Sequence, residues 1–373
     1  MIWALRLFVT FSVLSLACWA QSAGGVQQSG ADNTREQQSA KIDGREVKPL
    51  GLHLTPIETI SAPSEAATGF GELGCDGEGN LYFGSDSPAF PGIRKLSPKG
   101  ELLAVYKPDT NPDVKIEFAG DFFITQTGEV YLWVGAKDSF DRYALVFKSD
   151  GSYKSNIKLE AGFPWIPANI SVFSNGEILM TGQEFVQDAK QPMLPLTGIF
   201  STSGKLLKEL DLEDDGQITK MASAHDAHVV SAANPSSNRG VAWGRVAAAN
   251  DGNIYVMRWL SPAVFYAVSP GGEVVRRFTV DPGASGYMPV QMHISGGRIA
   301  VLFAHPSTQE KVMKIVDLTG HELASYDELR ADGKAKLGPL GLAFVCYTAR
   351  PERFTFVTTD ENHKLQLKQV EAR

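Results

Sequence analysis

A glycine that closes a tight turn recurs along this chain at nearly even intervals. It stands at positions 79, 128, 176, 252 and 297, so the steps are 49, 48, 76 and 45 residues. Each glycine lies between two apolar runs rich in β-branched and aromatic residues, which indicates a β-hairpin. A period in the forties with two hairpins per unit is typical of a β-propeller blade of four strands.

The repeat is clearest in residues 244–280. Its first hairpin turns at Asn250-Asp251-Gly252-Asn253, and its second turns at Ser269-Pro270-Gly271-Gly272. Four short strands in one meander cannot bury an apolar face alone, so the unit must pack against copies of itself. The one long step of 76 residues contains an insertion at about 213–243.

A sixth unit over residues 342–370 has only three strands. Residues 52–60 alternate between apolar and polar side chains and have no partner before the first blade. We expect this strand to be the outermost strand of the last blade, where Pro56, which lacks an N–H, is tolerated. The predicted fold is therefore all-β: a six-bladed propeller of four-stranded antiparallel blades over residues 49–373, closed by the N-terminal strand.

These motifs resemble those of the six-bladed propellers of the NHL-repeat and sugar-lactonase-like superfamily. The resemblance rests on Asp251-Gly252-Asn253-Ile254-Tyr255, on Ser269-Pro270-Gly271-Gly272-Glu273-Val274 and on their analogues, and covers about residues 50–373. It implies a polar ring at the mouth of a central channel. In lactonase-like relatives, carboxylates and amides of that ring hold a divalent cation, often Ca²⁺, beside an acid/base residue.

The ring positions lie seven residues before each first-turn glycine. They are Glu72, Asp121, Asn169 and Arg245, and in the fifth blade Gln291 and His293 stand near the matching position. Glu72, Asp121 and Asn169 are the candidate metal ligands, whereas the Arg245 guanidinium opposes a cation and could neutralise the carboxylates instead. A solvated polar ring without a metal is the favoured alternative, so we expect either no cofactor or Ca²⁺.

The longer loops are all expected on one face of the disc, because strand direction alternates within each blade. Irregular loops on a rigid scaffold are where binding sites concentrate. The candidate ligand-binding residues on this face are Trp165, Trp243, Trp259 and Tyr287, together with Arg245, Gln291 and His293 at the channel mouth. Further loop aromatics are Phe90, Phe140, Phe163 and Phe185. All these rings could instead cover the ends of the blade packing.

The N-terminus predicts export. Arg6, an apolar run over 7–17 and Cys18-Trp19-Ala20 form a signal peptide over residues 1–20, and the polar residues 21–48 form a flexible spacer. Lipid attachment at Cys18 is less favoured, because Ser15 stands where a lipobox has leucine. We expect a periplasmic or extracellular protein with no transmembrane segment in the mature chain. Cys75 and Cys346 form either a disulfide or two buried thiols.

Charge and motifs narrow the function. A formal net charge of −7 excludes a typical nucleic-acid surface. No nucleophile elbow or phosphate-binding loop is visible, and His225 and His228 in the insertion lack further ligands. We expect a monomeric, non-catalytic propeller that binds a protein, peptide or glycan of the cell envelope through its long-loop face. The alternative is a metal-dependent lactonase or lyase, and no catalytic residue is assigned.

Overall fold

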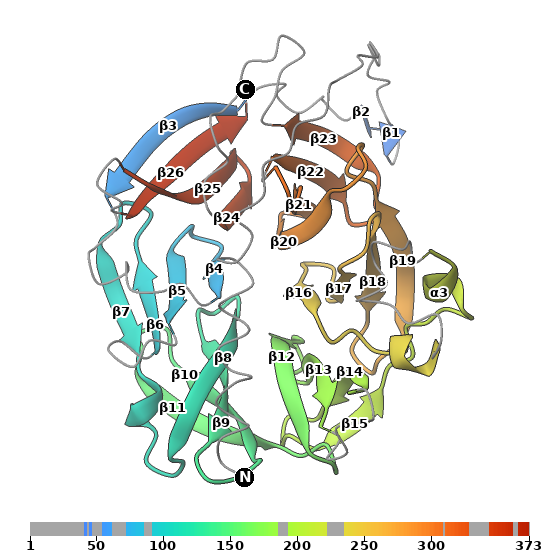
Figure 1. Ribbon diagram of the computed structural model, residues 1–373. Helices are drawn as coiled ribbons and strands as arrows, with labels where there is room; N and C mark the ends of the chain where they lie inside the picture. Colours follow the sequence, from blue (N-terminus) through green and yellow to red (C-terminus); the bar gives the residue numbers. More distant parts are fainter. Residues whose placement is uncertain are drawn as a thin grey trace.

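The computed structural model describes residues 41–42, 45–46, 54–61, 72–85, 92–185, 193–221, 235–308, 310–327, 343–360 and 365–372. These residues form six four-stranded antiparallel sheets around a central axis, as Figure 1 shows. A separate pair of two-residue strands, β1 (Lys41–Ile42) and β2 (Arg45–Glu46), lies in the predicted spacer. The six-bladed propeller predicted from the repeat is confirmed. The signal peptide lies outside the described residues.

The blades follow the repeat in chain order, each running from its innermost to its outermost strand. Blade 1 consists of β4 (Leu73–Cys75), β5 (Leu81–Ser85), β6 (Gly92–Leu96) and β7 (Leu102–Tyr106). Blade 2 consists of β8 (Ile116–Ile124), β9 (Val130–Ala136), β10 (Arg142–Phe147) and β11 (Tyr153–Leu159). Blade 3 consists of β12 (Trp165–Val172), β13 (Ile178–Glu184), β14 (Pro195–Phe200) and β15 (Leu206–Glu209).

The other three blades complete the ring. Blade 4 consists of β16 (Gly244–Ala248), β17 (Ile254–Arg258), β18 (Ala263–Val268) and β19 (Val274–Val280). Blade 5 consists of β20 (Met288–Ser295), β21 (Arg298–Ala304), β22 (Lys311–Asp317) and β23 (Glu322–Asp327). Blade 6 consists of β24 (Ala343–Ala349), β25 (Glu352–Thr359), β26 (Leu365–Ala372) and the N-terminal strand β3 (Leu54–Ser61). Short helices lie in the connections: η2 (Pro108–Thr110), and in the insertion α3 (Gln217–Met221) and η3 (Pro235–Asn238).

Glycine also recurs in the hairpin turn between the third and fourth strands of a blade, and the backbone geometry of that turn explains why. In blade 1, Gly100 adopts φ +82° and its N–H donates to the carbonyl oxygen of Ser97 at 2.9 Å. The strand pairing then shifts by one residue between Lys95 and Leu96. This is a type I turn followed by a bulge with a left-handed glycine. The same turn and the same shift occur at the glycines of blades 2 to 5, namely Gly151, Gly204, Gly272 and Gly320.

The N-terminal strand closes the ring as predicted. β3 pairs antiparallel with β26 and is the outermost strand of blade 6. Pro56 lies opposite Val370 beside a bulge, at an edge position where no ladder hydrogen bond is lost. Leu54 is buried in the core between blades 5 and 6. The described strand spans Leu54–Ser61, and the first two residues of the predicted strand, 52 and 53, lie outside the described residues.

A disulfide closes the ring a second time. Cys75 of β4 is bonded to Cys346 of β24, with Cα atoms 5.3 Å apart. The inner strands of blades 1 and 6 are therefore covalently joined, and the alternative of two buried thiols is wrong. The two closures lie at opposite ends of blade 6, one at its outermost strand and one at its innermost strand.

The core is divided among the contacts between neighbouring blades. One cluster joins blades 2 and 3 through Trp133, Trp165 and Phe200, with the rings of Trp165 and Phe200 stacked 5.2 Å apart. Another joins blades 4 and 5 through Tyr255 and Phe303. Each blade thus buries both of its faces against neighbours, which is the packing that the repeat required.

Removal of β3 should destabilise the whole ring. A protein that starts at Ser64 loses the buried side chain of Leu54 and the packing of Ile60, worth together about 3 kcal/mol or more. We expect its melting temperature to fall by at least about 6 °C. Because the disulfide still joins blades 1 and 6, reduction should lower the melting temperature of the truncated protein further than that of the full chain. An unchanged melting temperature after truncation would contradict closure by β3.

Candidate functional site at the channel mouth

The two faces of the disc differ as the sequence predicted. The tight hairpin turns of every blade lie on one face, which we call the turn face. The connections between the second and third strands and between successive blades lie on the opposite face, which we call the loop face. In Figure 1 the inner strands β4, β8, β12, β16, β20 and β24 surround the axis. Side chains on these strands are therefore the ones that can meet inside the ring.

The predicted ring residues do not all begin their strands. Glu72 directly precedes β4 and Arg245 is the second residue of β16. Asp121, Asn169 and Gln291 lie inside their strands, because β8, β12 and β20 begin earlier. A bulge explains the difference: the pairing shifts next to each of these three residues. An extra residue re-aims the side chain while the strand continues toward the loop face.

An ion pair spans the ring. Nη1 of Arg245 in blade 4 donates to Oε2 of Glu72 at the start of blade 1, at 2.7 Å. In a ring of six, blades 1 and 4 lie opposite each other, so this contact bridges the axis. The side chains are 24% and 34% exposed, so the ion pair is partly buried and still reached by solvent. Burial lowers the pKa of Arg245, but the charges of Glu72 and Asp121 more than offset it and the pKa is raised. Arg245 therefore stays charged.

Asp121 lies beside this pair as a weak acid. Its Oδ2 accepts the backbone N–H of Ile170 at the bulge of the neighbouring blade, at 3.1 Å. Burial and the Glu72 carboxylate raise the pKa of Asp121 to about 8, against the opposing effect of Arg245. The side chain is partly buried. The Asp121 carboxyl therefore holds its proton to a higher pH than an ordinary aspartate does.

Asn169 is committed to its own blade. The side chain is 5% exposed, and its Oδ1 accepts the hydroxyl of Thr181 at 3.1 Å. The same hydroxyl oxygen accepts the backbone N–H of Asn169 at 3.2 Å. These contacts tie β12 to β13 at the bulge. One of the two lone pairs of the Asn169 side-chain oxygen is therefore engaged within the blade.

Gln291 and His293 stitch blade 5 to blade 6. Oε1 of Gln291 accepts the backbone N–H of Phe344 at 2.6 Å, and Nε2 of His293 donates to the carbonyl oxygen of Phe344 at 3.1 Å. Both backbone groups lie at the bulge of β24. Burial lowers the pKa of His293 to about 4, and the charge of Arg245 acts in the same direction. His293 is neutral, with its lone pair on Nδ1.

The candidate metal ligands do not fit a calcium site in this arrangement. Ca²⁺ takes six to eight oxygen ligands, with carboxylates ionised. Glu72 is paired with Arg245, the pKa of Asp121 is raised, and the Asn169 side-chain oxygen accepts a hydrogen bond from Thr181. Among the residues that the structure describes, no three His, Cys, Asp or Glu side chains converge on one point. The two expectations from the sequence, no cofactor or Ca²⁺, are separated by a calcium titration.

The predicted aromatic residues separate into buried and exposed rings. Trp165 is buried in the core of blade 3, and Tyr287 is partly buried, with its hydroxyl donating to Glu310 at 3.3 Å. Trp259 is also partly buried, and the guanidinium carbon of Arg245 lies 6.0 Å from its ring centre. Trp243 is 49% exposed at the end of the insertion. Phe90, His225 and His228 lie outside the described residues.

Sequence reasoning missed two residues near this face. Thr181, which holds Asn169, occurs in mid-strand with no distinguishing pattern. Arg142 is the first residue of β10 and is buried, 5% exposed. A usable signal was present, since an arginine that directly follows a loop and begins an apolar strand is unusual in a blade core.

The pH dependence of stability should reveal the state of Asp121. Its pKa is raised from 3.8 to about 8 by folding, so between these values the folded state holds a proton that the unfolded chain has released. The contribution of Asp121 to the free energy of unfolding is fully present below pH 3.8 and is lost as the pH rises through about 8. The melting temperature of the wild type should therefore fall by several degrees more than that of Asp121→Asn between pH about 5 and about 8.5. Parallel curves would contradict the raised pKa.

A calcium titration tests the role of the ion pair. Because the guanidinium of Arg245 already neutralises Glu72, millimolar Ca²⁺ should leave the melting temperature of the wild type unchanged at constant ionic strength. Mg²⁺ at the same ionic strength serves as the control. A rise with Ca²⁺ that Asp121→Asn abolishes would instead establish the ring as a calcium site.

Comparisons with known proteins bear on the fold. No family model matches this chain, and no curated protein matches it. A candidate exported protein from Bacteroides fragilis is 10% identical with a TM-score of 0.49, covering 87% of this chain and 95% of that chain. The PQQ-bound aldose sugar dehydrogenase from Streptomyces coelicolor is 11% identical with a TM-score of 0.46, covering 85% and 97%. A candidate gluconolactonase is 11% identical with a TM-score of 0.45, covering 87% and 98%. At this identity, these similarities concern the fold alone.

No helix in the described residues is long and apolar enough to cross a membrane.

Proposed function

We propose that this protein is an exported, non-catalytic propeller that binds a protein, peptide or glycan of the cell envelope through its loop face. The observation that carries the proposal is the placement of its exposed rings. Among the described aromatic side chains, Phe140 and Trp243 are exposed, each at 49%. Both lie on the loop face. Large exposed aromatic side chains are rare on a monomer and are common at the centre of binding surfaces.

The exposed rings extend over several blades. Phe140, in the loop between β9 and β10 of blade 2, contacts Phe185 at the end of β13 in blade 3, with ring centres 5.4 Å apart. Trp243 stands directly before β16 of blade 4. A ligand that contacts both Phe140 and Trp243 must reach from blade 2 to blade 4. This extent favours a macromolecule or an extended chain over a small molecule.

The contacts of the polar groups at the channel mouth argue against a catalytic role for them. The polar groups of the ring are used to neutralise one another or to satisfy the bulges of neighbouring blades, as with Glu72 and Arg245 or Gln291 and Phe344. We also propose that the chain belongs to the NHL-repeat and sugar-lactonase-like superfamily, on the support of its recurring turn motifs. The alternative, a metal-dependent lactonase or lyase, would require Glu72 to exchange Arg245 for a metal.

Export is part of the proposal. The disulfide between Cys75 and Cys346 is consistent with an oxidising compartment, which agrees with the signal peptide expected over residues 1–20. The mature chain would act in the periplasm or outside the cell as a monomer, without a lipid at Cys18.

Replacing the exposed rings should abolish binding without unfolding the protein. The double variant Phe140→Ser/Trp243→Ser should bind immobilised envelope proteins, peptidoglycan or envelope polysaccharide at least about tenfold more weakly than the wild type. The matched control is Leu207→Ser/Val275→Ser, two apolar side chains exposed at 54% and 53% on outer strands away from the loop face. Retention of full affinity by the aromatic double variant, or equal loss in the control, would contradict the proposal.

A further inference from the structure

Arg142 is a buried cation that forms no ion pair with any acidic side chain in the described residues. It begins β10 at the loop face of blade 2 and is 5% exposed. The one hydrogen bond of its side chain in the described structure runs from Nη1 to the carbonyl oxygen of Asp141 at 3.1 Å. That oxygen also accepts the backbone N–H of Ala136 at 3.0 Å. Nε of Arg142 is buried with no partner.

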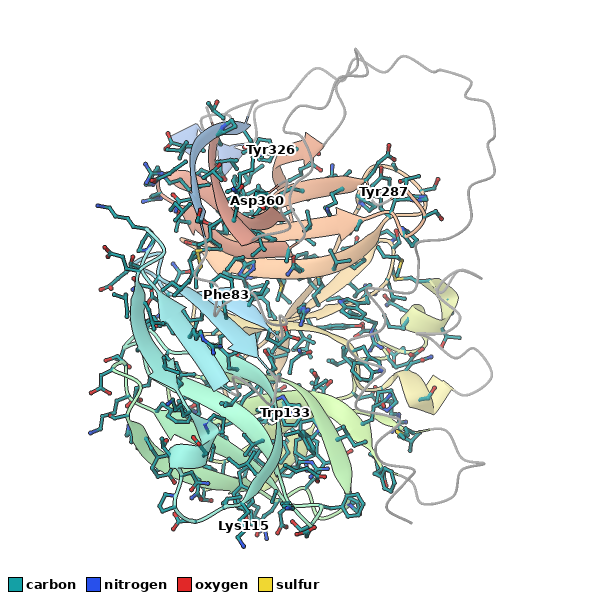
Figure 2. All side chains as sticks on the ribbon, turned by 60° about the vertical axis from the view of Figure 1, so that its left-hand side comes forward. Phe83, Lys115, Trp133, Tyr287, Tyr326 and Asp360 are labelled. Atoms are coloured by element: carbon teal, nitrogen blue, oxygen red, sulfur yellow. A yellow bond between two sulfur atoms is a disulfide. The ribbon has the colours of Figure 1, made fainter. Side chains whose placement is uncertain are left out.

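The nearby carboxylates do not pair with this guanidinium. The carboxylate of Asp141 is bonded to Nζ of Lys158 at 3.0 Å. Glu117 is exposed and acts on Arg142 only through its charge, with no ion pair between them in the described structure. The connection that follows β9 is joined to the segment before β8, because the backbone N–H of Lys137 donates to the carbonyl oxygen of Lys115 at 2.7 Å. Figure 2 shows Lys115 at the lower edge of the molecule.

Two aromatic rings fix the orientation of Arg142. Its guanidinium carbon lies 5.3 Å from the ring centre of Phe118, which meets Trp133 edge to face at 5.9 Å. Nε1 of Trp133 donates to the carbonyl oxygen of Ala168 at 3.0 Å, so the stack is anchored to blade 3. A Cβ at Gly135 would collide with the Phe118 ring. The guanidinium of Arg142 is thus held in place by the packed rings of Phe118 and Trp133.

Such an arrangement is costly unless something pairs with the charge. An ion removed from water requires good hydrogen bonds or an opposite charge. Arg258, which is 2% exposed, shares the unpartnered Nε but has two carbonyl partners where Arg142 has one, because its Nη2 donates to Asn238 and Leu212. Burial lowers the pKa of Arg142, as expected for a cation with too few partners.

We infer that Arg142 is a binding site for the oxyanion of a ligand, a carboxylate or a phosphate monoester, whose apolar body rests on the rings of Phe140 and Phe185. A planar guanidinium matches both oxyanions and binds them with two parallel hydrogen bonds. Phe140 stands two residues before Arg142, so one ligand can contact the ring and the cation together. This inference rests on the proposed function of the loop face and specifies the chemistry of the ligand there.

Small probes separate the anion from the ring. We would titrate the full-length protein with 3-phenylpropionate, phenyl phosphate and the neutral 3-phenylpropanamide at constant ionic strength, with binding followed by ligand-observed NMR. At least one of the two anions should bind about tenfold or more tightly than the amide. The tighter anion identifies the oxyanion as carboxylate or phosphate. Equal binding of all three probes would overturn the inference and leave the proposed aromatic surface intact.

Variants locate the effect on the guanidinium. Arg142→Met should abolish the preference for the anion while keeping weak binding of the amide, and its melting temperature should equal or exceed that of the wild type, because an unpaired buried charge is removed. Phe140→Ala should weaken all three probes alike and keep the preference for the anion. The matched control is Arg353→Met, an arginine of blade 6 paired with Glu371. Persistence of the preference in Arg142→Met, or its loss in Arg353→Met, would overturn the inference.

Discussion

Burial of each blade against its two neighbours is the constraint on which this structure depends. A sheet of four short strands cannot shield its apolar face alone. An open ring would therefore expose the apolar faces of the two blades on either side of the opening. The chain closes it at both ends of blade 6, with β3 on the outside and the bond between Cys75 and Cys346 on the inside. Closure holds the six inner strands in a fixed register, and that register is what places polar side chains around the axis.

Those polar side chains act mainly as fasteners between blades. Bulges in the inner strands leave backbone groups that the regular ladder cannot satisfy, and side chains of the preceding blade satisfy them. Asp121 does this for Ile170, and Gln291 and His293 do it for Phe344. A ring that resembles a catalytic site in sequence can therefore be explained by stability. On the loop face, Arg142 is held on Phe118 with no ion pair to an acidic side chain among the described residues, and stability does not explain this arrangement.

Sequence alone was sufficient for the fold, because turn glycines and alternating apolar runs are local signals. The strand over residues 54–61 could be assigned to the last blade since that blade lacked a strand. The ring residues were found by counting, but their contacts were not, because bulges at Asp121 and Asn169 change direction without a sequence signature. Burial of Trp165 and exposure of Trp243 could not be distinguished either, since both follow irregular loops. Pairing of Arg245 with Glu72 depends on the diameter of the ring, which no local pattern reveals.

The bond between Cys75 and Cys346 has a consequence for how the protein withstands cleavage. The two residues are 271 positions apart, so nearly every loop of the disc lies between them. A protease that cuts one such loop produces two fragments that remain tethered, and the strands on either side of the cut keep their neighbours. A single cut in such a loop therefore need not separate the two halves, and a denaturing gel run under reducing conditions would reveal it.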